Sequence, residues 1–385
     1  MVRCSQTVRR APPYARNLAS RRTRGIRLWG QCVGAVFLAG TVCCGSDEPL
    51  VWWEGEFVRY ATSSDLTPCA GTFALIDSFV PFVAGELGVK LPPKIEYQWL
   101  NRDEYGETAC PEGTRGCARG RHAYAQDPVL VHELVHNVTS ASGMNGLPFF
   151  SEGLAVAYDP FSQGGPRYIP SFAAPFPDPR LEMTRASADL DYGTASWFVT
   201  FLLVRYGPKP FVAISQRTHY GQDLDAIRNE FRAVYGRELD DEAELYIKGA
   251  DPGCGEDYFA LRPHDCVMPK VQWSSNHWTY EQTLDCGAES IAGGIGSDYN
   301  GFVTRSVTLD VPTAGSFTLE IYGGENTSMQ LGRCFGCPWQ HNDVTLYTNS
   351  DPVTFTTLEA GPYFVRLGAA SEDAPLAGVV IKPVG

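Results

Sequence analysis

The spacing of hydrophobic and polar residues first becomes regular well inside the chain, where it predicts two strands joined by a helix. Residues 56–62 and 94–100 alternate apolar and polar positions, as a strand with one buried face does. Between them, apolar residues recur at helical spacing from Phe73 to Val83, and Gly88 stands where the helix would end. This order of elements is typical of a domain that mixes helices with a sheet.

Further along, the same spacing predicts more helices and then a change to strands. Residues 197–204 and 222–235 have helical periodicity, and Gly236 would cap the second helix. From about residue 251 this periodicity ends, and Cys, Pro and Gly become dense. Short alternating runs then follow between Gly and Pro turns, at residues 306–311, 316–321, 353–357 and 363–367. They predict an antiparallel β-sandwich beyond a domain boundary.

Composition and charge limit the class of protein. The chain has 385 residues, of which 44% are hydrophobic and 19% charged, as in globular proteins of two or three domains. Eight of its 31 basic residues lie before residue 46, where there is no Asp or Glu, so the rest carries a formal net charge of −21. Because such a surface repels phosphate backbones, we expect no nucleic acid partner.

The N-terminal region has the composition of an export signal. A basic stretch leads into an apolar run at residues 33–42, which is too short to span a bilayer but has the length of a signal-peptide core. Cys43 and Cys44 follow it and resemble the lipid-attachment site of bacterial lipoproteins, although Thr41 stands where that family places its Cys. We expect either a cell-envelope lipoprotein, attached to the membrane only through a lipid at Cys43 or Cys44, or a protein secreted after cleavage near Gly45.

Cysteine usage agrees with export. Four of the twelve Cys lie at or before residue 44, and an even number of eight remains for disulfides in an oxidising compartment. We expect Cys110 to pair with Cys117, which is close to it in the sequence. We interpret Cys334 and Cys337 as a structural bridge rather than a redox or zinc CxxC motif, because no second CxxC exists.

The segment at residues 127–138 contains the pattern His-Glu-x-x-His. Asp127 is a good N-cap and Pro128 is favoured at the first helical position, so we expect a helix to begin there. On that helix His132 and His136 project from one face and could bind one tetrahedral Zn²⁺. Glu133 lies beside them, where its carboxylate could act as general base on a metal-bound water.

A zinc site of this type needs a third ligand, for which the sequence offers Glu152. The surrounding helix is almost entirely apolar, so its two His and its Glu would be costly to bury without a partner. Glu152 lies on a second predicted helix at residues 148–158, with fifteen residues between it and His136. Turns at residues 142–143 and 145–146 allow the chain to reverse and return this carboxylate to the metal.

The residues Phe-Phe-Ser-Glu-Gly-Leu-Ala at 149–155 are similar to the Trp-Leu-Asn-Glu-Gly-Leu-Ala pattern of gluzincin metallopeptidases, the group of thermolysin and aminopeptidase N. In that group two His and this Glu bind zinc. The resemblance implies zinc ligands at His132, His136 and Glu152, with Glu133 as the general base.

The resemblance extends to the next helix, where the family has a Tyr that stabilises the oxyanion. Tyr192 is the candidate for this role, Tyr158 is an alternative, and His219 is a third option. Two features depart from the family. No Gly-x-Met-x-Asn segment precedes His132, which favours an endopeptidase over an aminopeptidase. Val156 replaces the Asp of thermolysin-like enzymes, which leaves the partners of the His ligands open.

The C-terminal part also resembles a known domain. Residues 357–367 are similar to the pre-peptidase C-terminal domain, a small β-sandwich appended to secreted peptidases. With the gluzincin resemblance, this predicts an α+β zincin-like catalytic domain, with a mixed sheet and a mainly helical lower half, followed by an all-β sandwich. The predicted regions are a signal peptide or lipoprotein leader at 1–45, the catalytic domain at 46–250, a Cys-containing linker at 251–299 and the sandwich at 300–385.

We therefore expect an exported, zinc-dependent peptidase that acts on a protein or peptide substrate. One alternative is a surface binding protein with a structural or vestigial zinc site, which would bind through aromatic residues such as Trp273, Trp278 and Trp339. A second alternative keeps the zinc chemistry but applies it to an amide bond of a cell-wall peptide.

Overall fold

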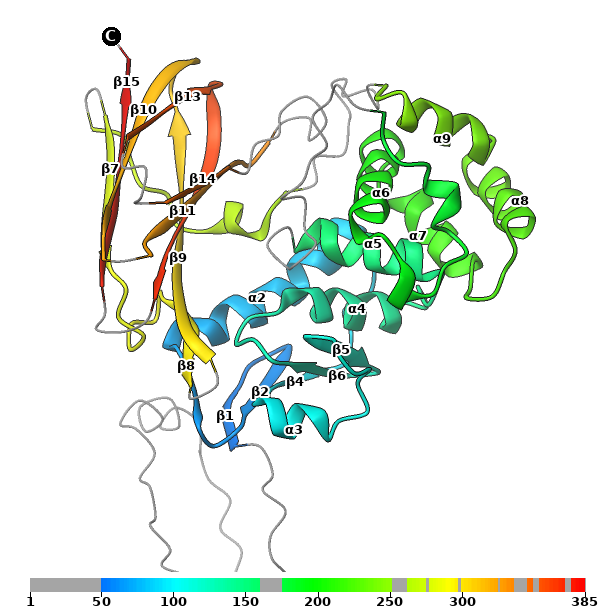
Figure 1. Cartoon of the computed structure of the whole chain (residues 1–385), viewed down its shortest axis with the longest axis horizontal. Coiled ribbons are helices and arrows are strands. Elements are labelled where there is room, and N and C mark those ends of the chain that lie inside the picture. The colour runs from blue at the N-terminus through cyan, green and yellow to red at the C-terminus, as the bar shows by residue number, and fades with distance from the viewer. Residues whose placement is uncertain are drawn as a thin grey trace, which may run out of the picture. The chain divides into compact units, whose positions relative to one another are not determined.

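The N-terminal half of the computed structural model is built on a five-stranded mixed sheet with the strand order β1-β2-β4-β6-β5 (Figure 1). Its strands are β1 (Leu50–Glu54), β2 (Val58–Thr62), β4 (Ile95–Trp99), β5 (Gly116–Arg119) and β6 (His122–Ala125). β2, β4 and β6 run parallel, whereas β1 and β5 pair antiparallel at the two edges. The structure describes residues 50–159, 175–250, 262–274, 277–296, 299–324, 326–335, 345–348, 353–370 and 375–384. The predicted leader at 1–45 lies outside them.

Helix α2 (Ala70–Leu87) confirms the predicted strand–helix–strand unit. Its buried face includes Ile76, Phe79 and Val83, which belong to the same hydrophobic core as the inward residues of β2 and β4. The helix ends at Gly88, whose φ of 65° is left-handed and suits a residue without a side chain. α2 is apolar enough to cross a membrane by length and composition, but its buried face makes it a core helix.

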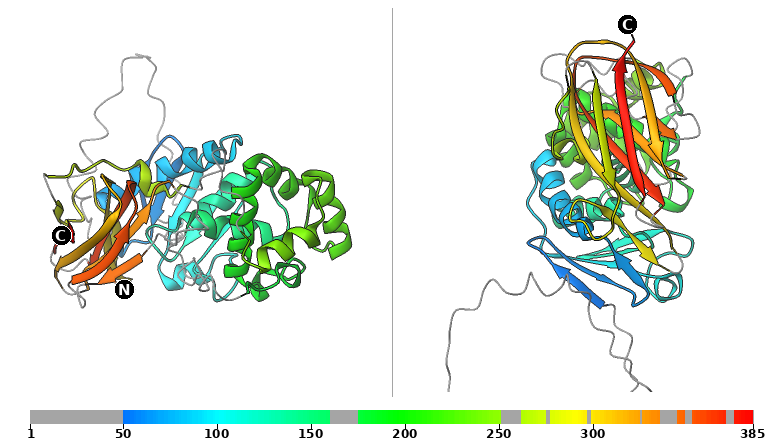
Figure 2. Two further views of the ribbon diagram at one scale, coloured as in Figure 1. Left: turned by 90° about the horizontal axis from the view of Figure 1, so that it is seen from above. Right: turned by 90° about the vertical axis from the view of Figure 1, so that its left-hand side faces the viewer.

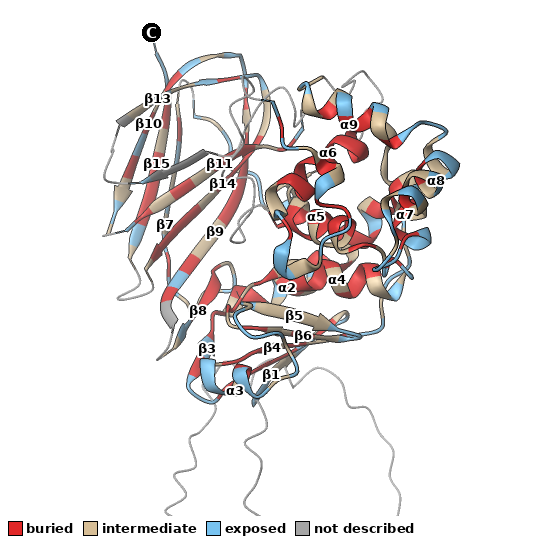
Figure 3. Cartoon of the chain, turned by 45° about the vertical axis from the view of Figure 1, so that its right-hand side comes forward, coloured by how far each residue is buried: buried red, intermediate tan, exposed pale blue. Residues whose placement is uncertain are grey.

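Seven further helices lie in the described residues of this half. They are α3 (Arg102–Gly106), which is the shortest, α4 (Val131–Ala141), α5 (Pro148–Tyr158), α6 (Tyr192–Tyr206), α7 (Pro208–Arg217), α8 (Leu224–Tyr235) and α9 (Leu239–Ile247). α6 is buried along most of its length, whereas α8 buries only one stripe (Figure 3). α8 ends at Gly236, as predicted. Single 3-10 turns at Pro179–Leu181 and Ser187–Asp189 precede α6.

The start of α4 differs from the prediction. Asp127 and Pro128 are not its first residues, because the helix begins only after Leu130. The backbone before it is held extended by two buried tyrosines of the sheet. Tyr97 Oη donates to the Asp127 carbonyl (2.9 Å) and accepts from the Leu130 N–H (2.8 Å), while Tyr60 Oη donates to the Pro128 carbonyl (2.7 Å). These bonds satisfy groups that a longer helix would have used itself.

The C-terminal half is a sandwich of two antiparallel sheets, as predicted (Figure 2). One sheet has the order β13-β10-β15-β7 and the other the order β12-β11-β14-β9-β8-β3. Their strands are β3 (Leu66–Pro68), β7 (Trp278–Thr283), β8 (Ala292–Gly296), β9 (Tyr299–Val311), β10 (Gly315–Gly323), β11 (Ser328–Arg333), β12 (Thr345–Thr348), β13 (Val353–Leu358), β14 (Gly361–Ala370) and β15 (Leu376–Pro383). A second hydrophobic core lies between them.

The segment at 251–299, which we expected to be a linker, contributes regular structure to the sandwich. β7 and β8 lie within it, and a 3-10 turn, η4 (His264–Val267), precedes them. Residues 251–261 lie outside the described part. Strand β3, which comes from the N-terminal half, pairs with β8 and forms the last strand of the larger sheet. The two halves therefore share a sheet.

Three disulfides are present among the described residues. Cys110 pairs with Cys117, as predicted. Cys334 is paired with Cys266, so it does not bridge to Cys337, which lies outside the described residues. The third disulfide joins Cys69 to Cys286. Three disulfides fit a protein that folds in an oxidising compartment.

Candidate metal centre

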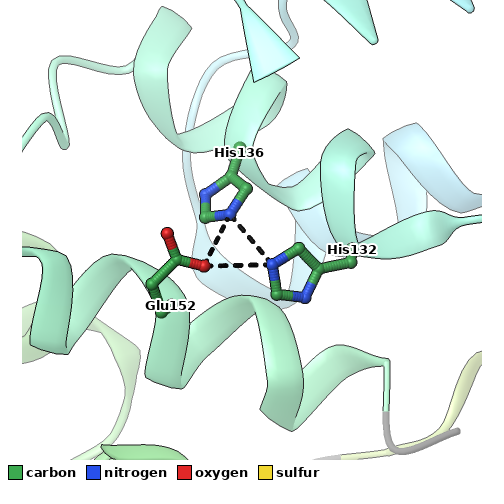
Figure 4. Close-up of side chains that lie close together, drawn as sticks. All are labelled: His132, His136 and Glu152. Atoms are coloured by element: carbon green, nitrogen blue, oxygen red, sulfur yellow. Dashed lines mark hydrogen bonds and ion pairs between the residues drawn. The ribbon is translucent and has the colours of Figure 1, made fainter. Parts of the chain in front are cut away.

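The three predicted metal ligands lie together between α4 and α5 (Figure 4). His132 and His136 are one turn apart on α4, and Glu152 comes from the first half of α5. Each pair among His132 Nε2, His136 Nε2 and Glu152 Oε2 is 3.1 Å apart. Three potential ligand atoms thus form an almost equilateral triangle.

This triangle fits a zinc ion. Ligands about 2.0–2.1 Å from a tetrahedral zinc are about 3.3 Å from one another, close to the separations seen here. Two imidazole nitrogens and one carboxylate oxygen are a donor set that catalytic zinc sites use, with the fourth position left to water or substrate. All three side chains are at least four-fifths buried, so few other partners can reach them.

Helix packing explains how Glu152 reaches the triangle. Its neighbour Gly153 faces α6, where an added β-carbon would come within 2.6 Å of the Ala195 carbonyl oxygen. The Gly therefore allows α5 and α6 to approach closely. α6 starts at Tyr192, because the side chain of Asp191 caps the helix through the backbone N–H of the next turn. Close packing and this cap bring Tyr192 to the metal site.

Two hydrogen bonds hold the histidine ligands. Ser151 Oγ lies 3.1 Å from His136 Nδ1, on the far side of the ring from the triangle. The carboxylate of Asp159 accepts a bond from the backbone N–H of His132 (3.3 Å). His132 Nδ1 is buried without a partner among the described residues. The sequence left the partners of the His side chains open, and Ser151 is the partner that the structure gives to His136.

Glu133 is buried next to the triangle, with only 5% of its surface exposed. Burial raises the pKa of its carboxyl, although His132 and His136 oppose the rise. Its neighbour on edge strand β5 is Gly116, where an added β-carbon would lie 2.8 Å from Glu133 Oε1. A residue without a side chain is thus needed at Gly116 for Glu133 to keep its position.

The charges of the triangle couple to one another in the protein without metal. Burial acts to lower the pKa of His136, but Glu152 and Glu133 outweigh it and raise the pKa to about 9. Burial acts in the opposite sense on Glu152, and the two His hold its pKa well below the usual range. A divalent cation in the triangle would replace the protons that these groups share.

The three candidates for oxyanion stabilisation lie in different places. The ring centroid of Tyr192 is 6.4 Å from that of His132, and its hydroxyl is close enough to Glu152 for that carboxylate to act on its pKa. Burial and the two glutamates raise its pKa, so it remains a donor. Tyr158 is buried against Phe82 of α2, and its hydroxyl has no partner among the described residues. His219 is exposed in the loop after α7.

A cavity of about 1050 Å³ opens onto the triangle and contains Glu133, Tyr192 and Tyr158 in its lining. β5 and the loop closed by the Cys110–Cys117 disulfide form part of its wall. The sequence analysis did not predict this wall. The local feature that could have indicated it is Gly116, where a side chain would collide with Glu133. The sequence analysis also did not predict that residues of the sandwich line the cavity. No local pattern indicates this, because it depends on how distant strands pair.

The aromatic residues considered for a binding function do not form a common surface in the described part of the chain. Trp278 is fully buried in the sandwich core, and Trp273 packs against that core. Trp339 lies outside the described residues. These positions agree with a structural role for Trp273 and Trp278.

No family model matches the chain, and no curated protein does. Among solved structures, a periplasmic inhibitor of g-type lysozyme from Aeromonas hydrophila is 15% identical over 30% of this chain and 97% of its own, with a TM-score of 0.21. The pre-peptidase C-terminal domain of a Bacillus anthracis collagenase is 12% identical over 30% of this chain and 92% of its own, with a TM-score of 0.19. At such TM-scores neither likeness identifies fold or function, so the chain is described by what it contains: a mixed α+β fold with a His-His-Glu cluster able to hold a metal ion.

Proposed function

We propose that this chain is an exported, zinc-dependent peptidase of gluzincin type on a zincin-like domain, and that it cleaves within protein or peptide substrates. The observation that carries the proposal is the convergence of His132, His136 and Glu152 on one point, with the carboxyl group of Glu133 beside it in a cavity. A zinc ion bound there would supply Lewis acidity to the scissile carbonyl and lower the pKa of its bound water.

Glu133 would move the protons of the reaction. Because burial raises its pKa, its carboxylate is a better base than that of a free glutamate. It takes a proton from the attacking water as the new C–O bond forms. It then gives this proton to the amine nitrogen as the C–N bond breaks. Gly116 leaves the space that the carboxyl group occupies, because a β-carbon there would lie 2.8 Å from Glu133 Oε1.

Tyr192 is the residue best placed to stabilise the charge that develops on the carbonyl oxygen. It lines the cavity together with the three ligands, and its raised pKa keeps the proton that it would donate. Tyr158, in contrast, is packed against α2, with Glu86 and Arg262 as its charged neighbours. We therefore assign the oxyanion role to Tyr192 and a packing role to Tyr158.

Strand β5 would align the substrate. It is the last strand of its sheet, so one of its edges has no strand partner among the described residues, and it lines the cavity. An extended peptide can add to such an edge through backbone hydrogen bonds that do not depend on its sequence. This arrangement favours an endopeptidase with an extended polypeptide as its partner, rather than a nucleic acid.

Export completes the proposal. The three disulfides support an oxidising location. The leader predicted at 1–45 would deliver the protein to the cell envelope, where a lipid at Cys43 or Cys44 would anchor it, or to the medium. Both Cys lie outside the described residues.

Two variants test the proposal on protein purified without its leader. Glu133→Gln should retain one zinc per chain by elemental analysis and cleave unstructured casein about 10²–10⁴-fold more slowly, because it loses the base but no ligand. Glu152→Ala should lose the zinc. The exposed Glu320→Gln is the matched control and should behave as wild type.

Two results would contradict the proposal. Full activity in Glu133→Gln would remove the base from the mechanism. Wild-type protein that takes up no zinc after dialysis against it would make the cluster structural and favour the binding-protein alternative.

A further inference from the structure

The cavity at the metal site has a wall that belongs to the β-sandwich. We call this the sandwich wall; its lining residues come from β9, β11 and β14 and are Phe302, Thr304, Ser328, Gln330, Arg366 and Gly368. They border the same cavity as Glu133 and the metal ligands. A substrate bound at the metal would therefore be next to two domains at once.

The sandwich wall is fixed in place by several contacts at the start of α2. The Cys69–Cys286 disulfide links the two halves, and β3 pairs with β8. The first backbone N–H groups of α2 donate to sandwich carbonyls: Ala70 to Cys286 and Gly71 to Ile291, each at 2.9 Å. Helix N-termini need such acceptors, so the sandwich completes α2. The disulfide and these hydrogen bonds thus hold the sandwich wall at the cavity.

A second contact brings the sandwich to the segment that precedes α4. An added β-carbon at Gly294 of β8 would lie 3.1 Å from Pro128 Cβ, in the segment that leads into α4. Ser78 of α2 also contacts His264, which comes just before the sandwich (3.2 Å). The sandwich and the segment before it therefore contact α2 and the chain segment that leads into α4.

The chemistry of the wall indicates what it binds. Arg366 is paired with the buried carboxylate of Asp265, so its charge is balanced within the protein. Thr304, Ser328 and Gln330 add uncharged polar groups. Phe302 adds an aromatic ring that is 40% exposed and lies against Gly368, where an added β-carbon would be 2.6 Å from the ring. A neutral, partly aromatic surface suits an extended polypeptide better than an anion or a cation.

We propose that the sandwich wall is a second substrate-binding surface, which recognises a polypeptide segment beyond the residues that flank the scissile bond. This inference rests on the proposed peptidase function. Its consequence is a preference for long, unfolded substrates, because a short peptide that occupies β5 and the metal cannot also cover the wall. Phe302 would make the main apolar contact.

The test compares two fluorogenic peptide libraries, of six and sixteen residues, with Phe302→Ala and a matched control. The control is Phe355→Ala, because Phe355 is 72% exposed on β13 of the other sheet. We expect wild type to have a higher kcat/KM on the long library. Phe302→Ala should lower kcat/KM about tenfold on the long library and much less on the short one. A tenfold loss is typical of removing one apolar side chain from a binding surface. Gln330→Ala should show the same bias with a smaller loss.

A binding measurement separates this inference from the proposed function. Fluorescence anisotropy of a labelled sixteen-residue library on the Glu133→Gln background should show about tenfold weaker binding after Phe302→Ala and no change after Phe355→Ala. If wild type cleaves neither library and this difference in binding is still observed, the peptidase proposal is wrong but the sandwich wall is a polypeptide-binding surface. Equal losses of kcat/KM on both libraries would contradict the proposal that the sandwich wall binds substrate. The same holds if Phe302→Ala changes neither cleavage nor binding.

Discussion

The metal centre and the joint between η4 and the sandwich, which is the ion pair of Asp265 with Arg366, both bury carboxylates, but they satisfy them in different ways. In the joint, Asp265 receives two bonds from Arg366 and one from Ser306, so the protein itself completes its hydrogen bonding. At the metal centre, Glu152 faces two imidazoles, and all three side chains could bind the same cation. Both carboxyl groups have a lowered pKa despite burial, which alone would raise it.

The difference teaches how to tell a structural carboxylate from a functional one. A buried charge with a full set of partners within the protein stabilises the fold when intact and is costly to break. A buried charge whose neighbours converge on one open point is completed by a ligand. Glu133 is a third case, because burial raises its pKa, as the base of the proposed mechanism requires.

The largest expected effect comes from breaking the joint. Asp265→Ala should lower the free energy of unfolding by about 3 kcal/mol, because it leaves the partly buried Arg366 without its counterion. Denaturant unfolding measures it, and Asp265→Asn serves if the Ala variant does not fold. The control Asp310→Ala removes the half-exposed partner of Lys270 and should cost less than about 1 kcal/mol. Equal costs for the two would show that the joint is no stronger than a surface pair.

A smaller effect is expected at the metal centre, where Ser151→Ala should weaken zinc binding about 10–100-fold without changing the number of zinc ions bound. The hydroxyl can accept the Nδ1 proton of His136, which leaves Nε2 free to face the metal. A competition titration with a chelator measures the affinity. Ser78→Ala is the matched control, since Ser78 contacts His264 in the same way away from the cluster. Loss of affinity in the control variant as well would contradict the assignment.

Much of the metal centre could be predicted from the sequence because its signals are local. The spacing of His132 and His136 follows from the helical repeat, and Gly88 and Gly236 ended α2 and α8 where their left-handed conformation is needed. Glu152 was found because its helix has a recognisable pattern. Such features depend on neighbours within a few residues.

The features that the sequence did not reveal depend on distant partners. α4 starts later than predicted because Tyr60 and Tyr97, from strands earlier in the chain, donate hydrogen bonds to the backbone before it. The partner of Cys334 is Cys266, and sequence alone cannot choose among the many pairings that eight Cys allow. The sandwich wall needs β3 to pair with a strand more than two hundred residues away, an event that no local periodicity records.

The smallest expected effect concerns acid. The folded pKa of Asp265 lies below its unfolded value near 3.8, so its contribution to stability is present above about pH 4 and is lost as the pH falls through the folded pKa. The stability advantage of wild type over Asp265→Asn should therefore shrink with decreasing pH below about 4, by at most about 1.4 kcal/mol per pH unit for one proton. Denaturant unfolding at several pH values measures the difference between the two proteins. An advantage that grows toward low pH would mean that Asp265 is protonated in the fold, and the joint would then resemble the buried base at the metal centre.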